Sequence, residues 1–408
     1  TSLVYNWLDE FEAYAPHLQA KIVHGTPEER KNILSRTDFY DVLITSYPLL
    51  RRDLALYEAK HFHTVFIDEA QFIKNAMTGN ARSVKGLHAK TRFALTGTPI
   101  ENSLSELWSI FDFIMPGYLF SYTRFAKRFE RPAAKGETEV LQQLSRRIKP
   151  FLLRRMKKDV LAELPDKIET KLVTELTEEQ RMLYLSYAKQ ARNELADEIS
   201  RVGVEKSRMQ ILAALTRLRQ ICCHPGMFLE NYDGGSGKLS LCVQILDDLK
   251  KSGHRVLIFS QFTSMLELLQ EALTESEISF FYLSGATKTK ERQDYVKRFN
   301  SGERDVFLIS LKAGGTGLNL TGADTVIHFD PWWNPAVEEQ ASDRAHRIGQ
   351  QKNVHIIRLL TKGTIEEKIF RMQQKKQDLF HAVIEAGETF LNKLTQEEIT
   401  ELFADPEI

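Results

Sequence analysis

Two neighbouring carboxylates stand directly after a short apolar run in the first quarter of the chain. Asp68 and Glu69 follow the letters VFI in the sequence VFIDEAQ. At the end of a strand, the first carboxylate can hold Mg²⁺, and the second can orient or deprotonate the water that attacks a phosphoryl group. Gln71 can donate and accept hydrogen bonds beside them. The alternative for Asp68 is a helix cap.

A second polar segment ends the next apolar run. Thr96, Gly97 and Thr98 stand before Pro99 in the sequence LTGTP. Hydroxyls in a tight turn, on a strand next to the acidic pair, suit a sensor that couples the nucleotide to a second lobe. The two motifs together are much more specific than an isolated Asp-Glu pair.

A pair of arginines lies in the segment QASDRAHRIGQ, residues 340–350. The i, i+3 spacing of Arg344 and Arg347 predicts that both guanidiniums lie on one face of a helix. Two such groups can neutralise the charge that develops on a transferring phosphoryl group, an effect of about 10³ to 10⁵ in rate. An isolated R-x-x-R pattern usually marks a solvated helix face.

A glycine-rich run, KAGGTGLN, follows an apolar run upstream of the arginines, at residues 312–319. Glycines allow the backbone to approach phosphates closely. The run therefore strengthens the assignment of the arginine pair to phosphate chemistry.

Short apolar runs separated by helical stretches must position these residues. Three runs precede residue 115 and five follow residue 236, and each is rich in Val, Ile and Phe, as parallel strands buried on both faces are. The alternation predicts an α/β fold with two parallel sheets, whose ligands bind at the carboxyl ends of the strands. The runs are 41–47, 64–70, 92–99, 255–262, 279–285, 305–315, 324–333 and 354–361.

Composition excludes several classes of protein. Of 408 residues, 42% are apolar and 27% charged, which is typical of globular proteins and not of collagen-like or disordered chains. The 55 basic and 55 acidic residues balance, so a nucleic-acid surface must be local. Three cysteines cannot form a disulfide framework. No apolar run approaches the ~18 residues of a membrane span.

Composition along the chain predicts four parts. Residues 1–115 form the first lobe, and 231–385 form the second. Residues 116–230, with helices expected at 178–202 and 206–221, form a helical insertion and linker that ends in a hinge at 231–237. Residues 386–408 form an acidic helix or tail.

The motifs, in this order and spacing, resemble those of the SWI/SNF-type ATPases of helicase superfamily two. The segments that carry the resemblance are DEAQ, LTGTPIEN, VLIFSQF, LKAGGTGLNLTGADTVIHFDPWWNP and QASDRAHRIGQ. The resemblance implies two RecA-like lobes, ATP with Mg²⁺ held by Asp68, and a monomer that translocates on double-stranded DNA without separating its strands. It places Gln71, Gly315, Gly317, Gln340 and Asp343 at the nucleotide.

The resemblance and the chemistry of strand ends together predict DNA-backbone contacts. Hydroxyls, amides and a lysine at strand ends can donate to phosphates, although ordinary strand-end capping is the alternative for each. We expect packing or loop anchoring for at least one of Trp332 and Trp333. The candidates are Thr45, Ser46, Ser260, Gln261, Ser284, Gly285, Lys312, Gly314, Thr316 and Trp332.

Two departures from the family matter. The family carries a phosphate loop of the form G-x-x-x-x-G-K-[ST] before the segment SLVYNW, where this chain begins, so we expect the ATPase to be the longer parent and this chain to be inactive. GGSGK at 234–238 lacks the preceding strand and the Ser or Thr. Gln71, where many members have His, favours a bacterial source and a cytoplasmic, nucleoid-associated protein rather than a nuclear one.

Two alternatives stay open. The chain can be a nucleotide-independent DNA-binding or interaction module, or part of an RNA-directed helicase. RNA polymerase is one candidate load among DNA-bound proteins. A zinc site is not expected, because the spacing of Cys222, Cys223, His224 and Cys242 contains no standard C-x-x-C pair.

Overall fold

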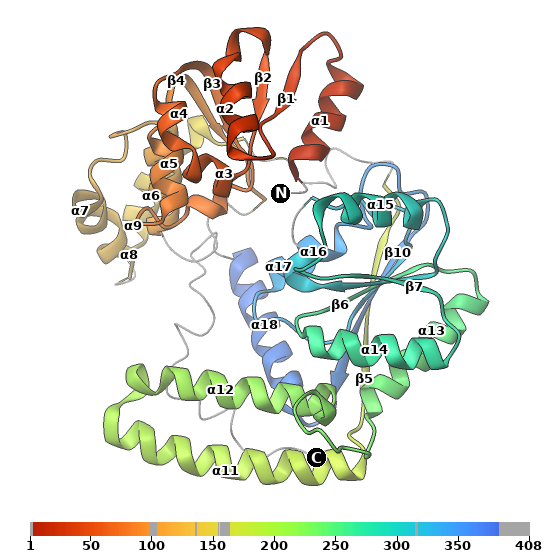
Figure 1. The fold of residues 1–408 in the computed structure, drawn as a ribbon. Helices are drawn as coiled ribbons and strands as arrows, with labels where there is room; N and C mark the ends of the chain where they lie inside the picture. The colour runs from red at the N-terminus through yellow and green to blue at the C-terminus, as the bar shows by residue number, and fades with distance from the viewer. Residues whose placement is uncertain are drawn as a thin grey trace. The chain divides into compact units, whose positions relative to one another are not determined.

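The computed structural model describes residues 3–97, 104–134, 137–153, 155, 164–314 and 317–382. The chain divides into two compact units, with the boundary after Val160 (Figure 1). Unit 1 precedes this boundary and unit 2 follows it. Both units are α/β with parallel strands, so the predicted fold class is confirmed.

Unit 1 contains two parallel two-stranded sheets. Strand β1 (Ala20–Ile22) pairs with β2 (Val42–Ile44), and β3 (His61–Ile67) pairs with β4 (His88–Ala94). The last three were predicted from their apolar runs, whereas β1 is too short to give a periodic signal. The pairing of Ile67 with Ala94 brings the polar segments after β3 and β4 to the same edge.

Helices surround these strands in unit 1. Helix α2 begins with a capping box, in which Thr26 and Glu29 satisfy each other's backbone groups. The described α-helices are α1 (Leu3–Tyr14), α2 (Pro27–Ser35), α3 (Tyr47–Arg52), α4 (Leu54–Glu58), α5 (Gly79–Lys85), α6 (Leu104–Ile114), α7 (Tyr122–Phe125), α8 (Arg131–Ala134) and α9 (Thr138–Ile148), with short helical turns at Thr37–Phe39, Ala70–Ile73, Ala126–Glu130 and Lys149–Phe151.

Unit 2 is built on one parallel sheet in the order β5-β10-β9-β6-β8-β7. All residues of β6, β8 and β9 are buried, which explains their uninterrupted apolar runs. The strands are β5 (Lys167–Thr174), β6 (Val256–Ser260), β7 (Phe280–Leu283), β8 (Val306–Ser310), β9 (Thr325–His328) and β10 (Val354–Thr361).

Strand β5 was not predicted. It lies within 116–230, which the sequence presented as a helical insertion and linker, yet it pairs with β10 along eight residues. As an edge strand with mostly exposed, alternating polar and apolar side chains, it lacks the apolar run of a central strand. The part of the chain before residue 230 therefore contributes to the second sheet.

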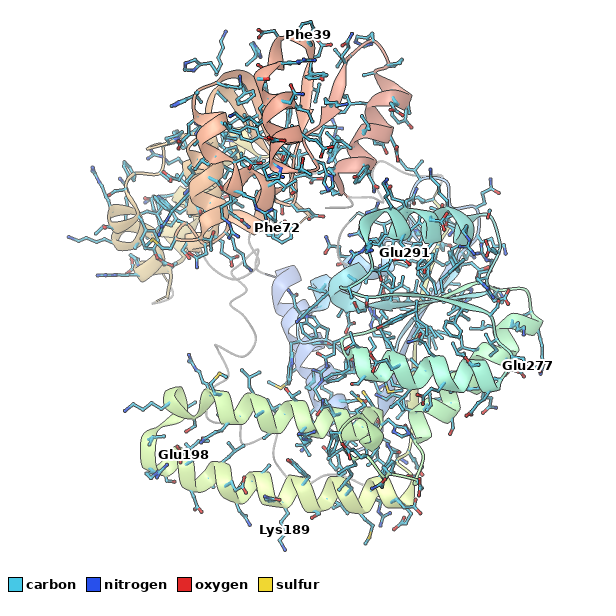
Figure 2. All side chains as sticks on the ribbon, in the orientation of Figure 1. Phe39, Phe72, Lys189, Glu198, Glu277 and Glu291 are labelled. Atoms are coloured by element: carbon cyan, nitrogen blue, oxygen red, sulfur yellow. The ribbon has the colours of Figure 1, made fainter. Side chains whose placement is uncertain are left out.

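Helices cover the sheet of unit 2, and α11 and α12 form an antiparallel hairpin beside them (Figure 1). Lys189 lies on the exposed side of α11, away from α12 (Figure 2). The described helices are α11 (Glu178–Val202), α12 (Val204–Cys223), a short turn at Pro225–Met227, α13 (Gly237–Lys251), α14 (Thr263–Glu275), α15 (Thr289–Asn300), α16 (Leu311–Gly314), α17 (Pro335–Ser342) and α18 (Ile365–Ala382).

The predicted hinge at 231–237 lies inside unit 2. Ser236 caps α13 and its hydroxyl donates to the Cys223 carbonyl at 2.6 Å, while Thr177 donates to the Gly234 carbonyl at 3.0 Å. These bonds fix the segment against α11 and α12, so it does not join the two units. The boundaries at 115, 230 and 385 stay predictions, and 386–408 lies outside the described residues. None of the described helices has the length and hydropathy to cross a membrane.

Candidate active site and nucleic-acid interface

The acidic pair of unit 1 stands in a sharp turn at the end of β3. Glu69 adopts a left-handed conformation with φ +50°, which costs backbone energy in a non-glycine residue. The Ala70 amide donates to the Leu95 carbonyl at 2.9 Å and so ties this turn to the end of β4. Both carboxylates are partly exposed, as groups that meet a ligand must be.

Three hydrogen bonds hold Asp68. Its Oδ2 accepts from Trp7 Nε1 at 2.9 Å, its Oδ1 from the Glu69 amide at 2.8 Å, and its carbonyl from the Tyr47 hydroxyl at 2.8 Å. The next short helix has Glu69 as its N-cap residue, so the helix-cap alternative for Asp68 is wrong. Phe72, labelled in Figure 2, packs against Tyr47 with the rings tilted by 52° and their centroids 5.6 Å apart.

The donor set of this turn fits Mg²⁺. Carboxylate oxygens are hard ligands, and Mg²⁺ is bound by one or two of them together with waters and substrate phosphates. The described residues contain no cluster of three or more His, Cys, Asp or Glu side chains that could enclose a metal. Asp68 would therefore hold the ion from one side only.

A short relay connects the acidic pair to the end of β4. Gln71 Nε2 donates to Glu69 Oε2 at 2.6 Å, and the Thr96 hydroxyl donates to Gln71 Oε1 at 3.0 Å. Both ends of the Gln71 amide are thereby used within unit 1. Gly97 is exposed beside Thr96, and Thr98 lies outside the described residues.

The segment after β2 carries the other predicted contacts of unit 1. The hydroxyl oxygens of Thr45 and Ser46 are shielded from solvent. Ser46 is the N-cap residue of α3, but its side chain makes no capping bond. The next residue, Tyr47, reaches Asp68, and burial raises the pKa of its phenol. A phosphate could reach these two hydroxyls only after local rearrangement.

In unit 2 the parallel register brings most predicted DNA contacts to one edge of the sheet. Ser260 pairs with Ser310 at the ends of β6 and β8, and Leu283 pairs with Ile309. The residues that follow, including Gly285 and Lys312, are exposed at this carboxyl edge. The carboxyl ends of β6, β7 and β8 therefore lie at the same edge of the sheet, as predicted.

Ser260 itself does not face solvent. Its side chain is only 1% exposed, and its hydroxyl donates to Asp330 Oδ1 at 2.5 Å. The Gln261 amide donates to the same carboxylate oxygen at 3.3 Å. In this structure the Ser260 hydroxyl is bonded within the edge, and its contact with DNA stays a prediction.

Sequence reasoning missed the residue that shapes the loop after β7. Arg292 donates to the carbonyls of Thr287, Ser284 and Gly285 at 2.8, 3.0 and 3.1 Å. Burial lowers its pKa. The surrounding sequence, KERQDY, is that of an ordinary charged helix face, so the sequence contains no signal for this role.

The glycine-rich run begins as α16, directly after β8. Gly317 has φ +68°, a conformation that favours glycine, and Lys312 points to solvent. Gly315 and Thr316 lie outside the described residues, and for Gly314 only the backbone is described. The close approach of this backbone to a phosphate stays a prediction.

The arginine pair does not share a helix face. Helix α17 ends at Ser342, and both Arg344 and Arg347 lie in the turns that follow. The Leu320 amide donates to the Arg344 carbonyl at 3.0 Å, a tertiary bond that replaces the next helical one. Arg344 is 2% exposed, whereas Arg347 is partly exposed, so the two guanidiniums have different surroundings.

Two further predicted nucleotide contacts flank the arginines. Gln340 and Asp343 are both partly exposed, and Asp343 lies 3.9 Å from Lys167 of β5. Arg347 donates through Nε to the Asp343 carbonyl at 3.2 Å, so this turn is internally bonded.

Both tryptophans after β9 are partly buried. Trp332 packs on the core beneath β6 and β8, and Trp333 packs on the core formed by α11, α12 and α18. The Trp332 amide donates to Glu338 at 2.6 Å. The expectation that packing holds at least one of them is confirmed, and base stacking by Trp332 has no support in this geometry.

The cysteines and GGSGK have structural roles. Cys222, Cys223 and Cys242 are free and buried, and burial raises the pKa of their thiols.

Lys238 of the GGSGK segment forms a fully buried ion pair with Glu366. This lysine cannot reach a phosphate, so GGSGK is not a phosphate loop.

The chain matches two known domain families. The SNF2-related domain matches residues 1–227, and the helicase conserved C-terminal domain matches residues 237–349. The chain belongs to the SNF2-related family. This SNF2-related chain is similar to the putative ATP-dependent helicase/translocase YwqA of Bacillus subtilis, with 40% identity over 99% of this chain and 44% of that protein.

Other proteins similar to this chain are also ATP-dependent helicases or SWI2/SNF2 ATPases. An uncharacterized ATP-dependent helicase of Mycoplasma pneumoniae is 38% identical over 98% of the chain and 38% of that protein. The SWI2/SNF2 ATPase core of Sulfolobus solfataricus in complex with dsDNA is 36% identical, with a TM-score of 0.50 over 100% of this chain and 85% of that one. The SNF2-related chain spans about two fifths of the length of the curated bacterial relatives.

Proposed function

We propose that this SNF2-related chain is part of an ATP-dependent translocase that acts on double-stranded DNA without separating its strands. The observation that carries the proposal is the relay from Asp68 and Glu69 through Gln71 to Thr96, which connects phosphoryl-transfer carboxylates to a strand-end sensor. The family supports the use of ATP, and the solved relative with dsDNA supports the duplex as partner.

In the proposed mechanism Asp68 would hold Mg²⁺, and Glu69 orients and deprotonates the attacking water. Bound Mg²⁺ would supply charge neutralisation at the phosphates. Gln71 fixes the Glu69 carboxylate and reports its state to Thr96, Gly97 and Thr98. No G-x-x-x-x-G-K-[ST] segment occurs among the 408 residues, so the proposed mechanism requires a phosphate loop outside them.

Unit 2 contributes the remaining chemistry. Arg344 and Arg347 neutralise charge on the transferring phosphoryl group, and Gly315, Gly317, Gln340 and Asp343 line the nucleotide. The exposed Lys312 and the loop at Gly285 contact the DNA backbone, together with the side chain of Gln261. Such contacts position a duplex without reading its sequence.

The setting is part of the same proposal. The bacterial relatives support a bacterial source. We propose that the protein is a monomer that works on nucleoid DNA in the cytoplasm, with a DNA-bound protein such as RNA polymerase as its load. The relay argues against a nucleotide-independent module, because a DNA clamp has no use for a carboxylate aligned with a sensor hydroxyl.

ATP hydrolysis by the full-length protein tests this function. We expect strong stimulation by duplex DNA, weak stimulation by single-stranded DNA, and none by RNA. Stimulation by RNA above that by duplex DNA would support the RNA-directed alternative. Duplex binding without any ATP hydrolysis would support the nucleotide-independent module.

A further inference from the structure

We propose that Arg219 is a positioning residue for the DNA-contacting edge of unit 2. It joins the loop after β9, residues 330–333, to the loop after β6, residues 260–262, and links both loops to the α11–α12 hairpin. This inference rests on the proposed function of that edge.

Arg219 projects from α12 into the space between the two loops. Its side chain is 2% exposed, and its guanidinium carbon lies 5.2 Å from the Trp333 ring centroid and 5.6 Å from that of Phe262. Nη2 donates to Asp330 Oδ2 at 3.4 Å and, over a short distance, to the Pro331 carbonyl. One guanidinium therefore contacts the side chains of both loops.

Asp330 completes the junction from the other side. Its Oδ1 accepts from the Ser260 hydroxyl at 2.5 Å and from the Gln261 amide at 3.3 Å, while its Oδ2 faces Arg219. The carboxylate and the guanidinium thus connect α12, the end of β6 and the end of β9. Planar guanidinium groups suit such shared contacts better than lysine does.

The buried charges of Arg219 and Asp330 stabilise each other. Asp330 is buried, which raises the pKa of its carboxyl, while the Arg219 guanidinium and the Ser260 hydroxyl lower it. A buried carboxylate without its counter-charge must take up a proton or move towards water. Either change alters the hydrogen bonds that Asp330 accepts from Ser260 and Gln261.

Other contacts keep the loop after β9 attached when Arg219 is lost. Glu338 accepts from the Trp332 amide at 2.6 Å and from Arg358 Nε at 3.1 Å, and Gln373 donates to the Trp332 carbonyl. The loop therefore keeps its links to α17 and α18. The expected consequence of losing Arg219 is a shift of this loop relative to Gln261.

Arg217 provides a matched control on the same helix. It lies two residues from Arg219, donates to Gln220 at 3.1 Å and stacks on Phe228, with its guanidinium carbon 4.0 Å from the ring centroid. None of these contacts involves the loops after β6 or β9. Arg217→Met therefore removes an arginine from α12 without touching the junction.

The test is ATP hydrolysis by the full-length protein as a function of duplex DNA concentration. Arg219→Met should raise the half-stimulating duplex concentration about tenfold, equivalent to one lost interaction of ordinary strength. Turnover without DNA, and at saturating DNA, should change less than about twofold. Arg219→Lys should lie between Arg219→Met and wild type, and Arg217→Met should match wild type.

The double variant Arg219→Met/Asp330→Asn separates positioning from stability. Removing both charges relieves the buried unpaired carboxylate, so thermal stability should recover relative to Arg219→Met. The half-stimulating concentration should stay high, because the junction between the loops is still missing. The double variant also keeps the test decisive if Arg219→Met fails to fold.

Two results would overturn the inference. One is a folded Arg219→Met with a wild-type half-stimulating concentration, and the other is a double variant in which that concentration returns to the wild-type value. A wild-type protein that duplex DNA does not stimulate would instead overturn the proposed function itself.

Discussion

The acidic turn of unit 1 and the carboxyl edge of the sheet in unit 2 use charged residues in opposite ways. In unit 1, Asp68 and Glu69 are partly exposed, and the donors to their carboxylates include an indole, a backbone amide and a side-chain amide. In unit 2, the edge of the sheet lies over buried ion pairs, Arg219 with Asp330 and Lys238 with Glu366. The acidic turn of unit 1 keeps its charges accessible, whereas the charges beneath this edge of unit 2 are buried.

The proposed function accounts for this difference. A carboxylate that binds a metal or activates water must keep its charge and meet solvent, so neutral hydrogen bonds can orient it without neutralising it. A surface that tracks a regular backbone needs fixed loop positions. Buried ion pairs supply these, because breaking one costs much more than the pair contributes in net stability.

The largest expected effect is in unit 1. Glu69→Gln in the full-length protein should keep ATP binding but lower DNA-stimulated hydrolysis about 10²- to 10⁴-fold, the usual contribution of a general base. Steady-state hydrolysis and nucleotide titration measure the two quantities. The exposed Glu10 in α1 provides the control, because Glu10→Gln should hydrolyse ATP normally. Retained turnover in Glu69→Gln would refute the role of this carboxylate.

The next largest expected effect is a loss of stability when a buried charge of unit 2 loses its partner. Glu366→Ala leaves Lys238 unpaired in the interior and should lower the free energy of unfolding by about 3–5 kcal/mol. Glu175→Ala removes the exposed pair with Lys362 and should cause no measurable change. Urea unfolding monitors both variants. Equal losses of unfolding free energy in the two variants would mean that the buried pair contributes no more to stability than the exposed pair.

An intermediate effect is expected from pH. Burial lowers the pKa of His328 to about 3, helped by the charges of Arg358 and Lys167. The unfolded chain binds a proton near pH 6.5, so this group's contribution to stability is complete above that pH and is lost as the pH falls towards 3. Between pH 7 and 5.5 the loss should be about 1 kcal/mol.

His328→Gln is the test of that pH dependence. The variant removes the titrating group beside Ser342, whose hydroxyl lies 2.8 Å from His328 Nε2. Urea unfolding at pH 7 and 5.5 should show a smaller pH dependence than in wild type. An unchanged pH dependence would mean that other groups dominate acid destabilisation.

The smallest expected effect concerns a neutral hydrogen bond of unit 1. Tyr47→Phe removes the bond from the hydroxyl to the Asp68 carbonyl and should cost about 0.5–1.5 kcal/mol of stability. If this bond also orients Asp68, DNA-stimulated hydrolysis should fall several-fold, whereas Tyr14→Phe, at an exposed position, should change neither quantity. Normal hydrolysis in Tyr47→Phe would limit Tyr47 to a structural role.

Prediction from sequence succeeded where the residues of a single segment were enough to indicate its structure. The buried runs of β6, β8 and β9 were recognised because both faces of these strands are apolar, and the acidic pair was recognised because it ends such a run. The helix α11 was predicted with the observed bounds, Glu178–Val202. The edge strand β5 was missed because its exposed face is polar.

The structure departs from the local sequence pattern where a side chain or carbonyl has a partner elsewhere in the chain. Helical spacing placed Arg344 and Arg347 on one face, but helix α17 ends at Ser342, and the Arg344 carbonyl accepts from the distant Leu320 amide. The strand-end position of Ser260 indicated a phosphate contact, but its hydroxyl meets Asp330, 70 residues away.

The order of the motifs, the strand ends that carry them and their chemistry could all be read from the chain, because each depends on residues that are neighbours in sequence. Which of those side chains meet solvent, and which support others from beneath, depended on contacts such as that of Arg219 with Asp330, across 111 residues. Burial and pairing are properties of the packed molecule, since local sequence does not specify which distant charge will lie opposite a given side chain.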